Sequence, residues 1–323
     1  MTSATAFWIS ERERGELVKL DIPSPADTEL RIRTLYTGIS RGTETLVFAG
    51  RVPEDEHDHM RAPFQSGDFS FPVKYGYINV GTVEQGPHHL QGKTVFCLFP
   101  HQTLFNVPIE SVTVLPDQLP PERAVLAAYM ETAINALWDA QPRVGDRISV
   151  VGAGVLGSLV AYLAARIVAC EVQLIDINPE RAQIAKALGI EFAQPEQAQR
   201  NQDLVIHTSA TEQGLNLALA LAGFEATVLE LSWYGNRPVS INLGSAFHSQ
   251  RLNLKSSQVG HVASSQRPRW DYQRRLQLAL SRLKDPCLDV LISGESHFSQ
   301  LPETLQWLSS SDNTSLCHRI TYD

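Results

Sequence analysis

A glycine-rich segment, Gly152-Ala153-Gly154-Val155-Leu156-Gly157, limits the possible folds of this chain more than any other feature. The run before it, Ile148-Ser149-Val150-Val151, has the composition of a buried strand, and a helical pattern of apolar residues follows it. Gly152 permits a sharp bend between strand and helix, and Gly154 allows a ligand to approach the backbone. Gly157 allows the helix to pack closely on the strand. The spacing therefore predicts a turn that binds the pyrophosphate of a dinucleotide at a helix N-terminus.

The segments around this turn alternate between buried strands and helices. The expected strands are 147–151, 171–176, 203–207 and 226–231, and the expected helices are 158–169, 179–188 and 214–221. Strands that alternate with helices form a parallel sheet with helices on both faces. We therefore expect the α/β fold class, with a doubly wound Rossmann sheet in this part of the chain.

Asp176 ends the second expected strand, about 20 residues after the glycine turn, where a dinucleotide site needs an acid. Its carboxylate can accept hydrogen bonds from the adenosine ribose and would repel a 2′-phosphate. Arg181, a turn into the next helix, argues for the phosphorylated cofactor, and capping of that helix is the alternative role for Asp176. The pattern favours NAD over NADP.

The first third of the chain has a β-rich pattern, with expected strands at 29–36 and 94–99 and a polar loop over 50–71. Leu119-Pro120-Pro121-Glu122-Arg123 is typical of a helix start, and this helix should run to about Ala140. Two helices, 272–283 and 301–309, and a strand, 317–322, should follow at the C-terminal end. We divide the chain into a β-rich domain over 1–121, a βαβ domain over 122–258 and a return to the first domain over 259–323.

Composition excludes several classes of protein. The chain has 323 residues, a net charge of −8 and no basic run, so nucleic acid is not an expected partner. No apolar stretch approaches the roughly 20 residues that span a bilayer, and the N-terminus has no signal pattern, so we expect no membrane contact and a cytoplasmic location. The four cysteines are isolated and form no CxxC pair: Cys97, Cys170, Cys287 and Cys317.

Two further motifs give the chain a resemblance to a known family. They are Thr37-Gly38-Ile39-Ser40-Arg41-Gly42-Thr43-Glu44 and Gly76-Tyr77-Ile78-Asn79-Val80-Gly81-Thr82-Val83. With the glycine turn and the order of domains, they resemble the medium-chain dehydrogenase/reductase superfamily, the relatives of zinc alcohol dehydrogenase and quinone oxidoreductase. The resemblance implies a GroES-like first domain, a small-molecule substrate held between the domains, and a homodimer or homotetramer.

The run over 38–44 is also similar to bacteriochlorophyllide dehydrogenases, which oxidise a hydroxyethyl side chain. The stretches 231–235 and 256–260 look like those of dehydrogenases in the same neighbourhood. This weaker similarity suggests an alternative substrate and nothing more.

The resemblance implies zinc ligands that this chain lacks. Zinc members hold the metal with a Cys, a His in a Gly-His-Glu turn, and a third Cys or acid. Here the turn contains Gly76-Tyr77-Ile78, the first position falls on Ser40 or Arg41, and the third falls near Ala128. The four-Cys structural loop expected after Phe99 is also missing. A catalytic zinc needs about three such ligands, so we expect no metal, and the acidic cluster 55–59 is typical of a solvated surface.

Without zinc, a side chain must polarise the reacting oxygen. Tyr77 replaces a metal ligand, and its phenol could donate a hydrogen bond or, with a lowered pKa, act as a base. Ser40 and Thr43 could relay protons, and His101 has a side chain suited to proton transfer. The alternatives are that Tyr77 fills space and that His101 is a structural loop histidine. Glu44 is expected to be a buried hydrogen-bond partner.

The resemblance also implies roles for four residues at the ends of later strands, and for one aromatic residue. Thr208 and Ser209 would approach the adenosine and pyrophosphate, whereas Ser232 and Trp233 would lie near the nicotinamide amide. Phe99 matches an aromatic residue of the substrate pocket. His207 and His248 are expected to be structural.

Together these observations predict a zinc-independent, NAD(H)-dependent oxidoreductase that acts on an alcohol/carbonyl pair. Reduction of a quinone or enone with NAD(P)H is the first alternative, since that reaction also proceeds without zinc. A protein that binds NAD without turnover is the second, because a fold alone does not establish chemistry.

Overall fold

The computed structural model describes residues 2–310 and 313–323, which form two compact units. Among the described residues, unit 1 comprises 2–128, 280–310 and 313–323, and unit 2 comprises Tyr129–Ala279. The predicted boundaries after residues 121 and 258 fall earlier in the chain than these divisions. The later boundary differs because Arg275, in a helix expected to return to the first domain, is buried against Glu131 in unit 2.

Unit 2 contains a six-stranded parallel sheet in the order β12-β11-β10-β13-β14-β15. The strands are β10 (Arg147–Val151), β11 (Glu171–Ile175), β12 (Glu191–Ala193), β13 (Gln202–His207), β14 (Ala222–Glu230) and β15 (Asn253–Ser256). The chain runs outward from β10 in one direction and then from β13 in the other. Such a reversal places ligands at the carboxyl ends of the central strands.

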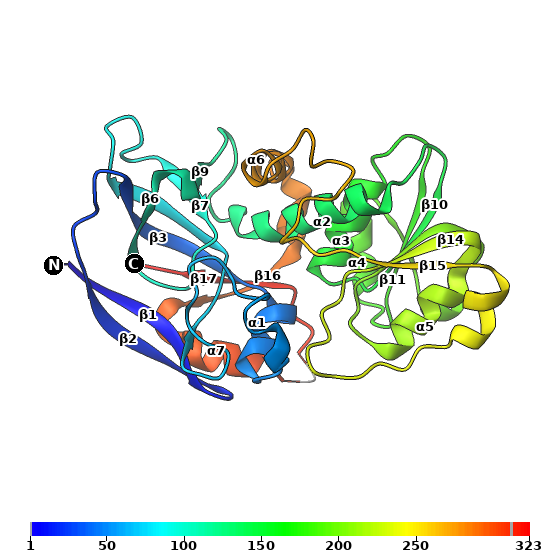
Figure 1. Cartoon of the computed structure of the whole chain (residues 1–323). Helices are drawn as coiled ribbons and strands as arrows, with labels where there is room; N and C mark the ends of the chain where they lie inside the picture. Colours follow the sequence, from blue (N-terminus) through cyan, green and yellow to red (C-terminus); the bar gives the residue numbers. More distant parts are fainter. Residues whose placement is uncertain (1, 311–312) are drawn as a thin grey trace. The chain divides into compact units, whose positions relative to one another are not determined.

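Helices cover both faces of this sheet. The helices that pack on its strands are α3 (Val155–Ala164), α4 (Arg181–Leu188) and α5 (Glu212–Leu221). Most of α2 (Ala127–Ala140) and of α6 (Tyr272–Arg282) also belongs to unit 2, with short turns η4 (Pro195–Gln197) and η5 (Leu243–Phe247). The connections β10–α3–β11 and β13–α5–β14 have the same handedness but run in opposite directions along the sheet. They therefore place α3 and α5 on opposite faces of the sheet, as Figure 1 shows. On one face, α5 buries Leu215 and Leu219 against Val205 and Val228.

Unit 1 is built on two mainly antiparallel sheets, ordered β2-β1-β5-β4 and β16-β17-β3-β6-β7-β9, with β8 paired to β3. The strands are β1 (Thr2–Glu11), β2 (Arg14–Ile22), β3 (Glu29–Ile39), β4 (Ser66–Gly67), β5 (Val73–Lys74), β6 (Asn79–Gln85), β7 (Thr94–Cys97), β8 (Leu104–Pro108), β9 (Val112–Val114), β16 (Ile292–His297) and β17 (Cys317–Thr321). The helices are α1 (Arg41–Phe48) and α7 (Leu301–Leu308), with short turns η1 (Glu54–Glu56), η2 (Ile109–Ser111), η3 (Ala124–Leu126), η6 (Pro286–Leu291) and η7 (Phe298–Gln300).

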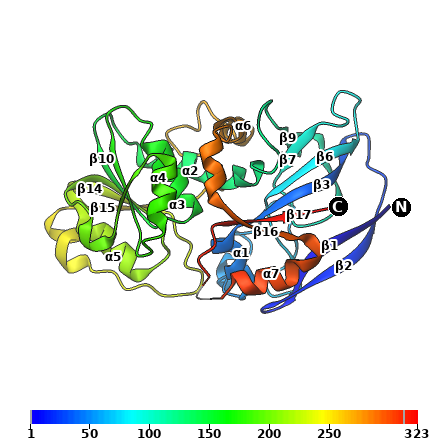
Figure 2. The same ribbon diagram turned by 180° about the vertical axis from the view of Figure 1, so that it is seen from behind.

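Two distant parts of the sequence complete unit 1. β17 pairs antiparallel with β3 and parallel with β16, and α7 packs beside β2, as Figure 2 shows. The core of the larger sheet contains Leu30, Ile32, Val95 and Phe105, all fully or almost fully buried. The C-terminal segment is therefore part of the framework that positions β3.

The βαβ elements predicted from the sequence are present, with shifted ends. The strand 147–151 has its predicted bounds, whereas the helix expected over 158–169 begins at Val155, because Gly154 is its N-cap. The helix α1 was not predicted, and it occupies much of the 37–44 motif and the residues after it. Across the two described stretches, none of the helices is both long enough and apolar enough to span a bilayer.

Candidate functional site

The glycine turn of unit 2 has the geometry of a phosphate cradle. Gly152 has φ +107°, which favours glycine, and a Cβ on Gly157 would lie 1.9 Å from the Gly152 carbonyl oxygen. Gly154 is exposed at the N-cap of α3, and a Cβ there would meet no atom within 4 Å beyond its chain neighbours. The turn is thus tightly packed between Gly152 and Gly157 and open at Gly154, where the first amides of α3 can face an anion.

Asp176 is hydrogen-bonded to this turn. The Ala153 amide donates to Asp176 Oδ2 at 2.7 Å, and the Asn178 amide donates to Oδ1 at 2.8 Å. The helix-cap alternative does not hold, because the N-cap of α4 is Glu180. Each carboxylate oxygen has a further lone pair, so Asp176 can still accept hydrogen bonds from a ribose diol.

Thr208 holds the turn in place from the next strand. Its hydroxyl lies 3.1 Å from the Val151 carbonyl oxygen and 2.9 Å from that of Gly152, and donates toward both. The amide nitrogen of Ser209 is 2.8 Å from the place of a Cβ on Gly152, so the loop after β13 packs against the turn. The structure thus brings the predicted residues Thr208 and Ser209 to the glycine turn, where Thr208 shapes the backbone.

A buried hydrogen-bonded chain lies at the same edge of the sheet. His207 Nδ1 is 2.7 Å from Glu230 Oε2, and His207 Nε2 is 2.7 Å from the Ser209 hydroxyl. Ser209 Oγ is 2.9 Å from the Thr211 hydroxyl. The sequence did not predict this series of hydrogen bonds, and Glu230 was not among the expected site residues. The available signal was that His207 and Glu230 end neighbouring parallel strands, in which they are paired in register.

The residues after β14 attach to this chain. The Ser232 amide donates to Glu230 Oε1 at 2.7 Å, and the Ser232 hydroxyl accepts from the Ala210 amide at 3.1 Å. Trp233 follows it and is half-buried. The predicted cofactor residues of unit 2 therefore all lie at or just beyond the carboxyl ends of β10, β11, β13 and β14.

Unit 1 contains the predicted catalytic residues. Burial, with the nearby charge of Glu44, raises the pKa of Tyr77 to about 12, although hydrogen bonds from Ser40 and Thr43 lower it. The phenol of Tyr77 is therefore protonated at neutral pH and suited to donate a hydrogen bond. The phenol is therefore a poor base. Of the two chemical roles considered for Tyr77, base and hydrogen-bond donor, the geometry favours the donor.

His101 lies beside this group but is enclosed. It is 2% exposed, with Nδ1 2.6 Å from the Thr37 hydroxyl and Nε2 2.8 Å from Glu44 Oε2. Glu44 also accepts the Ser40 amide at 2.7 Å, as a buried hydrogen-bond partner would. Because both ring nitrogens have side-chain partners, the geometry favours a positioning role for His101 over contact with substrate.

Phe99 belongs to the hydrophobic core. It is 6% exposed and stacks on Phe105 with ring centres 3.8 Å apart and planes 8° apart. Leu30 and Ile32 belong to the same cluster. The prediction that Phe99 lines a substrate pocket has no support in this geometry.

The residues present do not fit a zinc ion. Within residues 2–310 and 313–323, no group of three or more His, Cys, Asp or Glu side chains could hold a metal. His101 would have to give up a side-chain partner to become a ligand. In the 55–59 cluster, His57 lies 3.3 Å from Asp68 and against the edge of Phe69.

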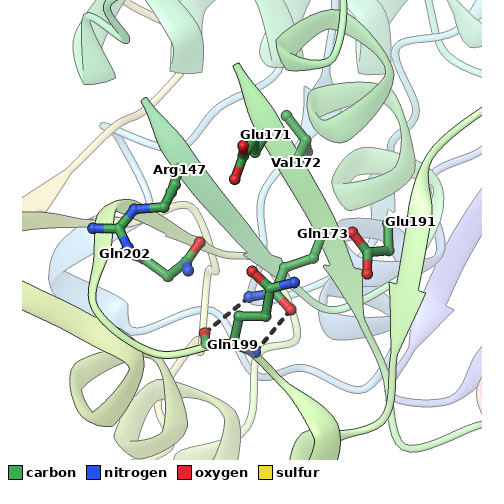
Figure 3. Close-up of a pocket in the computed structure, with 7 residues that line it drawn as sticks. All are labelled: Arg147, Glu171, Val172, Gln173, Glu191, Gln199 and Gln202. Atoms are coloured by element: carbon green, nitrogen blue, oxygen red, sulfur yellow. Dashed lines mark hydrogen bonds between the residues drawn. The ribbon is translucent and has the colours of Figure 1, made fainter. Parts of the chain in front are cut away.

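A polar cavity of about 180 Å³ lies elsewhere on unit 2, at the amino ends of the strands (Figure 3). Its lining residues are Arg147, Glu171, Val172, Gln173, Glu191, Gln199 and Gln202. The Gln173 amide bridges the backbone nitrogen and oxygen of Gln199, as Figure 3 shows. In a parallel sheet of this kind ligands bind at the opposite, carboxyl edge, so the cavity is not assigned to the site.

Sequence comparison finds relatives among the dehydrogenases. The chain is 22% identical over 295 residues to D-guloside 3-dehydrogenase of Escherichia coli K12, covering 82% of each protein. It is 29% identical over 118 residues to L-threonine 3-dehydrogenase of Chelativorans sp. BNC1, covering 36% of this chain and 34% of the relative. No protein-family model matches the sequence.

Solved structures share the fold over nearly the full chain. L-Idonate 5-dehydrogenase of Escherichia coli K-12 has a TM-score of 0.81 at 14% identity, covering 99% of this chain and 98% of its own. An alcohol dehydrogenase of Escherichia coli CFT073 in complex with NADH has a TM-score of 0.76 at 15% identity, covering 99% of this chain and 100% of its own. A protein of Sinorhizobium meliloti 1021 described as a zinc-binding dehydrogenase, bound to NADP, has a TM-score of 0.79 at 14% identity. The match covers 99% of this chain and 100% of that protein. At these identities the likeness establishes the two-domain fold.

Proposed function

We propose that the chain, an oxidoreductase of the medium-chain dehydrogenase/reductase superfamily, uses NAD(H) without zinc to interconvert an alcohol and its carbonyl compound. The observation that carries the proposal is the hydrogen bond from Ala153 in the glycine turn to Asp176. It couples the phosphate cradle to a carboxylate that can accept a ribose diol. That carboxylate would repel a 2′-phosphate, which supports NAD over NADP.

The side chains of unit 1 support the absence of zinc. Tyr77 stands where zinc members have a histidine ligand, and Ser40 and Thr43 supply hydroxyls to its phenol. The nicotinamide, when bound, carries the hydride. Tyr77 donates a hydrogen bond to the carbonyl oxygen and gives up its proton as the alcohol forms. Ser40 and Thr43 stabilise the phenolate by hydrogen bonds and relay to it a replacement proton taken from solvent.

The buried pair of His101 and Glu44 holds this arrangement. Glu44 accepts the Ser40 amide, and His101 packs against Gly76, where a Cβ would lie 2.9 Å from the ring. Together they fix both segments that carry the hydroxyl groups. We therefore assign His101 and Glu44 to positioning and Tyr77 to contact with substrate.

Two relatives support a secondary alcohol on a small polar molecule as the substrate class, since they are named for D-guloside and L-threonine. The raised pKa keeps the Tyr77 phenol protonated at neutral pH, as donation of a hydrogen bond to a carbonyl oxygen requires. We further propose a homodimer or homotetramer, which light scattering after size-exclusion chromatography would measure.

Cofactor titration tests the proposal first. NADH should quench tryptophan fluorescence at lower concentrations than NADPH, and elemental analysis should find no stoichiometric zinc. Tighter binding of NADPH would overturn the cofactor assignment, and one zinc per chain would overturn the metal assignment.

Turnover tests the reaction. NADH oxidation should occur with keto forms of polyols or glycosides and not with quinones or enones. Activity confined to quinones or enones would favour the alternative reductase. Tight NADH binding without turnover across both panels would favour a protein that binds the cofactor without catalysis.

A further inference from the structure

The polar cavity at the amino edge of the unit 2 sheet has no role in the proposed function. It has a volume of about 180 Å³, and all of its lining residues except Val172 have a charged or amide side chain. Four of them are the first residues of four neighbouring strands (Figure 3): Glu191 of β12, Glu171 of β11, Arg147 of β10 and Gln202 of β13. The glycine turn lies at the opposite end of β10, so a ligand in this cavity does not compete with a dinucleotide.

The two carboxylates of the cavity have no partner in the described part of the chain. Glu171 and Glu191 are both exposed, and within residues 2–310 and 313–323 neither side chain makes a hydrogen bond or an ion pair. Arg147 lies next to Glu171 in the register of β10 and β11, but its guanidinium faces Asp203 at 3.5 Å. The cavity therefore has two negative charges with which no cation of the described residues pairs.

Gln202 adds a buried acceptor to the cavity. The residue is 2% exposed, and its amide nitrogen donates to the Arg200 carbonyl at 3.2 Å. Its Oε1 atom has no donor among the described residues, and in Figure 3 this oxygen points toward the side of the cavity that Glu171 lines. Gln173, the other buried amide, is already held by the backbone of Gln199. Because a carbonyl oxygen that is buried without a donor is costly, Gln202 favours a ligand that brings an N–H group.

The helices that lead into these strands add partial negative charge at the same edge. Each crossover helix of a parallel sheet runs back from the carboxyl edge to the amino edge, so α3 ends before β11 begins and α4 ends before β12 begins. The last carbonyl groups of a helix carry a partial negative charge. The last turn of α3 contains no basic residue to offset it. The backbone therefore also favours a cation at this edge.

We propose that the cavity binds a small molecule through a primary ammonium group, which donates to Glu171, Glu191 and the Gln202 carbonyl oxygen. An ammonium group has three N–H donors and no acceptor, so it matches the three acceptors and the negative charge. Amines and α-amino acids share this group. An α-amino acid also has a carboxylate, for which Arg147 is the donor, since its pair with Asp203 is exposed and weak. This inference does not depend on the proposed function.

Three ligands with the same three-carbon chain test the assignment. Of these, n-propylamine has the ammonium group alone, propionate has the carboxylate alone, and L-alanine has both. We expect n-propylamine and L-alanine to bind with Kd of about 1 mM or lower, as a few charge-assisted hydrogen bonds allow, and propionate not to bind at about 10 mM. NMR titration of the isotope-labelled chain measures binding, and the side-chain amide signal of Gln202 should be among those that shift.

The two ammonium ligands distinguish the source of the group. Tighter binding of L-alanine, with the advantage lost in Arg147→Met, would identify an α-amino acid. Equal or tighter binding of n-propylamine would identify an amine. Both results support an ammonium site.

Two variants locate the site. Glu171→Gln and Glu191→Gln keep the size of the side chain and remove its charge, and each should weaken binding of both ammonium ligands by about tenfold or more. Glu196→Gln, the same change at an exposed glutamate that does not line the cavity, should bind them like the wild type. Urea denaturation checks that all three variants are folded.

The proposal is overturned if propionate binds as tightly as the two ammonium ligands, or if neither ammonium ligand shifts any signal at about 10 mM. It is also overturned if Glu171→Gln and Glu191→Gln both bind like Glu196→Gln. Failure of the chain to bind NADH would overturn the proposed function and leave this inference intact.

Discussion

The carboxylate of Asp176 uses its two oxygens for two backbone amides, one in the glycine turn and one after β11. It therefore fixes the shape of the cradle as well as the charge that a ribose would meet. A neutral side chain of the same size separates these roles, because it can keep one amide bond while it loses the negative charge.

We expect Asp176→Asn to shift the ratio of NADPH to NADH affinity toward NADPH by about tenfold or more, since the repulsion of a 2′-phosphate is lost. Affinity for NADH should fall, because the asparagine can accept only through one of its two terminal atoms. Fluorescence titration with both cofactors measures the ratio. An unchanged ratio would show that Asp176 does not face the 2′ position.

Tyr77→Phe tests the proton donor. We expect kcat for carbonyl reduction to fall by about 10²-fold with little change in KM, because the lost hydrogen bond strengthens only as the alkoxide forms. Tyr75→Phe is the matched control, since Tyr75 is a buried neighbour with its ring centre 6.0 Å from that of Tyr77. Equal loss in both variants would argue for packing as the role of Tyr77.

The raised pKa of Tyr77 also predicts a pH profile. Because this pKa is about 12, the phenol stays protonated below that pH, and the donor is present throughout the working range. With saturating cofactor, kcat for carbonyl reduction should therefore show no loss attributable to a phenol near pH 10. A fall centred on pH 10, absent in Tyr77→Phe, would mean that the phenol titrates at its ordinary value.

At the scale of elements, the entry into α3 combines two glycines with different constraints. A Cβ on Gly157 would collide with the backbone of Gly152, whereas a Cβ on Gly154 would enter open space. Gly157 is therefore required by the fold, whereas the fold leaves room for a side chain at Gly154.

We expect Gly157→Ala to lower the free energy of unfolding by about 2 to 4 kcal/mol and to weaken NADH binding, because the strand and helix must move apart. Gly154→Ala should unfold like the wild type but bind NADH at least about tenfold more weakly. Chemical denaturation and NADH titration of both variants measure this. The idea of an open cradle fails if Gly154→Ala binds NADH normally.

The sequence predicts the four central strands of unit 2 and the helices between them, because their alternation leaves a periodic pattern around the glycine turn. It misses the short edge strands β12 and β15. It does not predict α1, since Gly42 and the β-branched Thr43, Thr45 and Val47 have low helix propensity. Within this helix, Glu44 accepts a hydrogen bond from the amide of the N-cap residue Ser40 and is held from outside the helix by His101.

The candidate site shows the same contrast between residues that leave a pattern in the sequence and residues that are placed by contacts in the fold. Asp176 is predictable because its distance from the turn along the chain is characteristic of dinucleotide sites. The pairing of His207 with Glu230 is not visible in that way, because it depends on the register of two parallel strands. Likewise, the enclosure of His101 by Thr37 and Glu44 depends on contacts between residues far apart in the sequence.

At the scale of the whole molecule, unit 1 is assembled from two segments that flank unit 2 in the sequence. Arg123, from the first segment, is 6% exposed and meets Asp289 of the second with Nε and a terminal nitrogen at 2.6 and 2.8 Å. It also donates to the carbonyls of Leu283 and Lys284 at 3.3 and 3.0 Å. One guanidinium thus joins the two parts of the unit.

We expect Arg123→Met to lower the free energy of unfolding by about 2 to 3 kcal/mol, since the buried Leu283 carbonyl and the partly buried contact to Lys284 lose their charged donor. Asp289→Asn should cost less, about 1 kcal/mol, because Asp289 is largely exposed and its partner keeps the carbonyl contacts. Urea denaturation measures both. Equal stability of Arg123→Met and the wild type would show that the segments are held together without this contact.

The pairing of β17 with β3 also sets an order of events on the ribosome. Residues 36–39 of β3 emerge early, but their antiparallel neighbours, residues 318–321, are made only after all of unit 2. Unit 2, later in the sequence, is continuous and can close its sheet first. During that interval β8 can cover residues 29–33 on this edge of β3, but residues 36–39 have no strand to pair with there and are open to wrong partners.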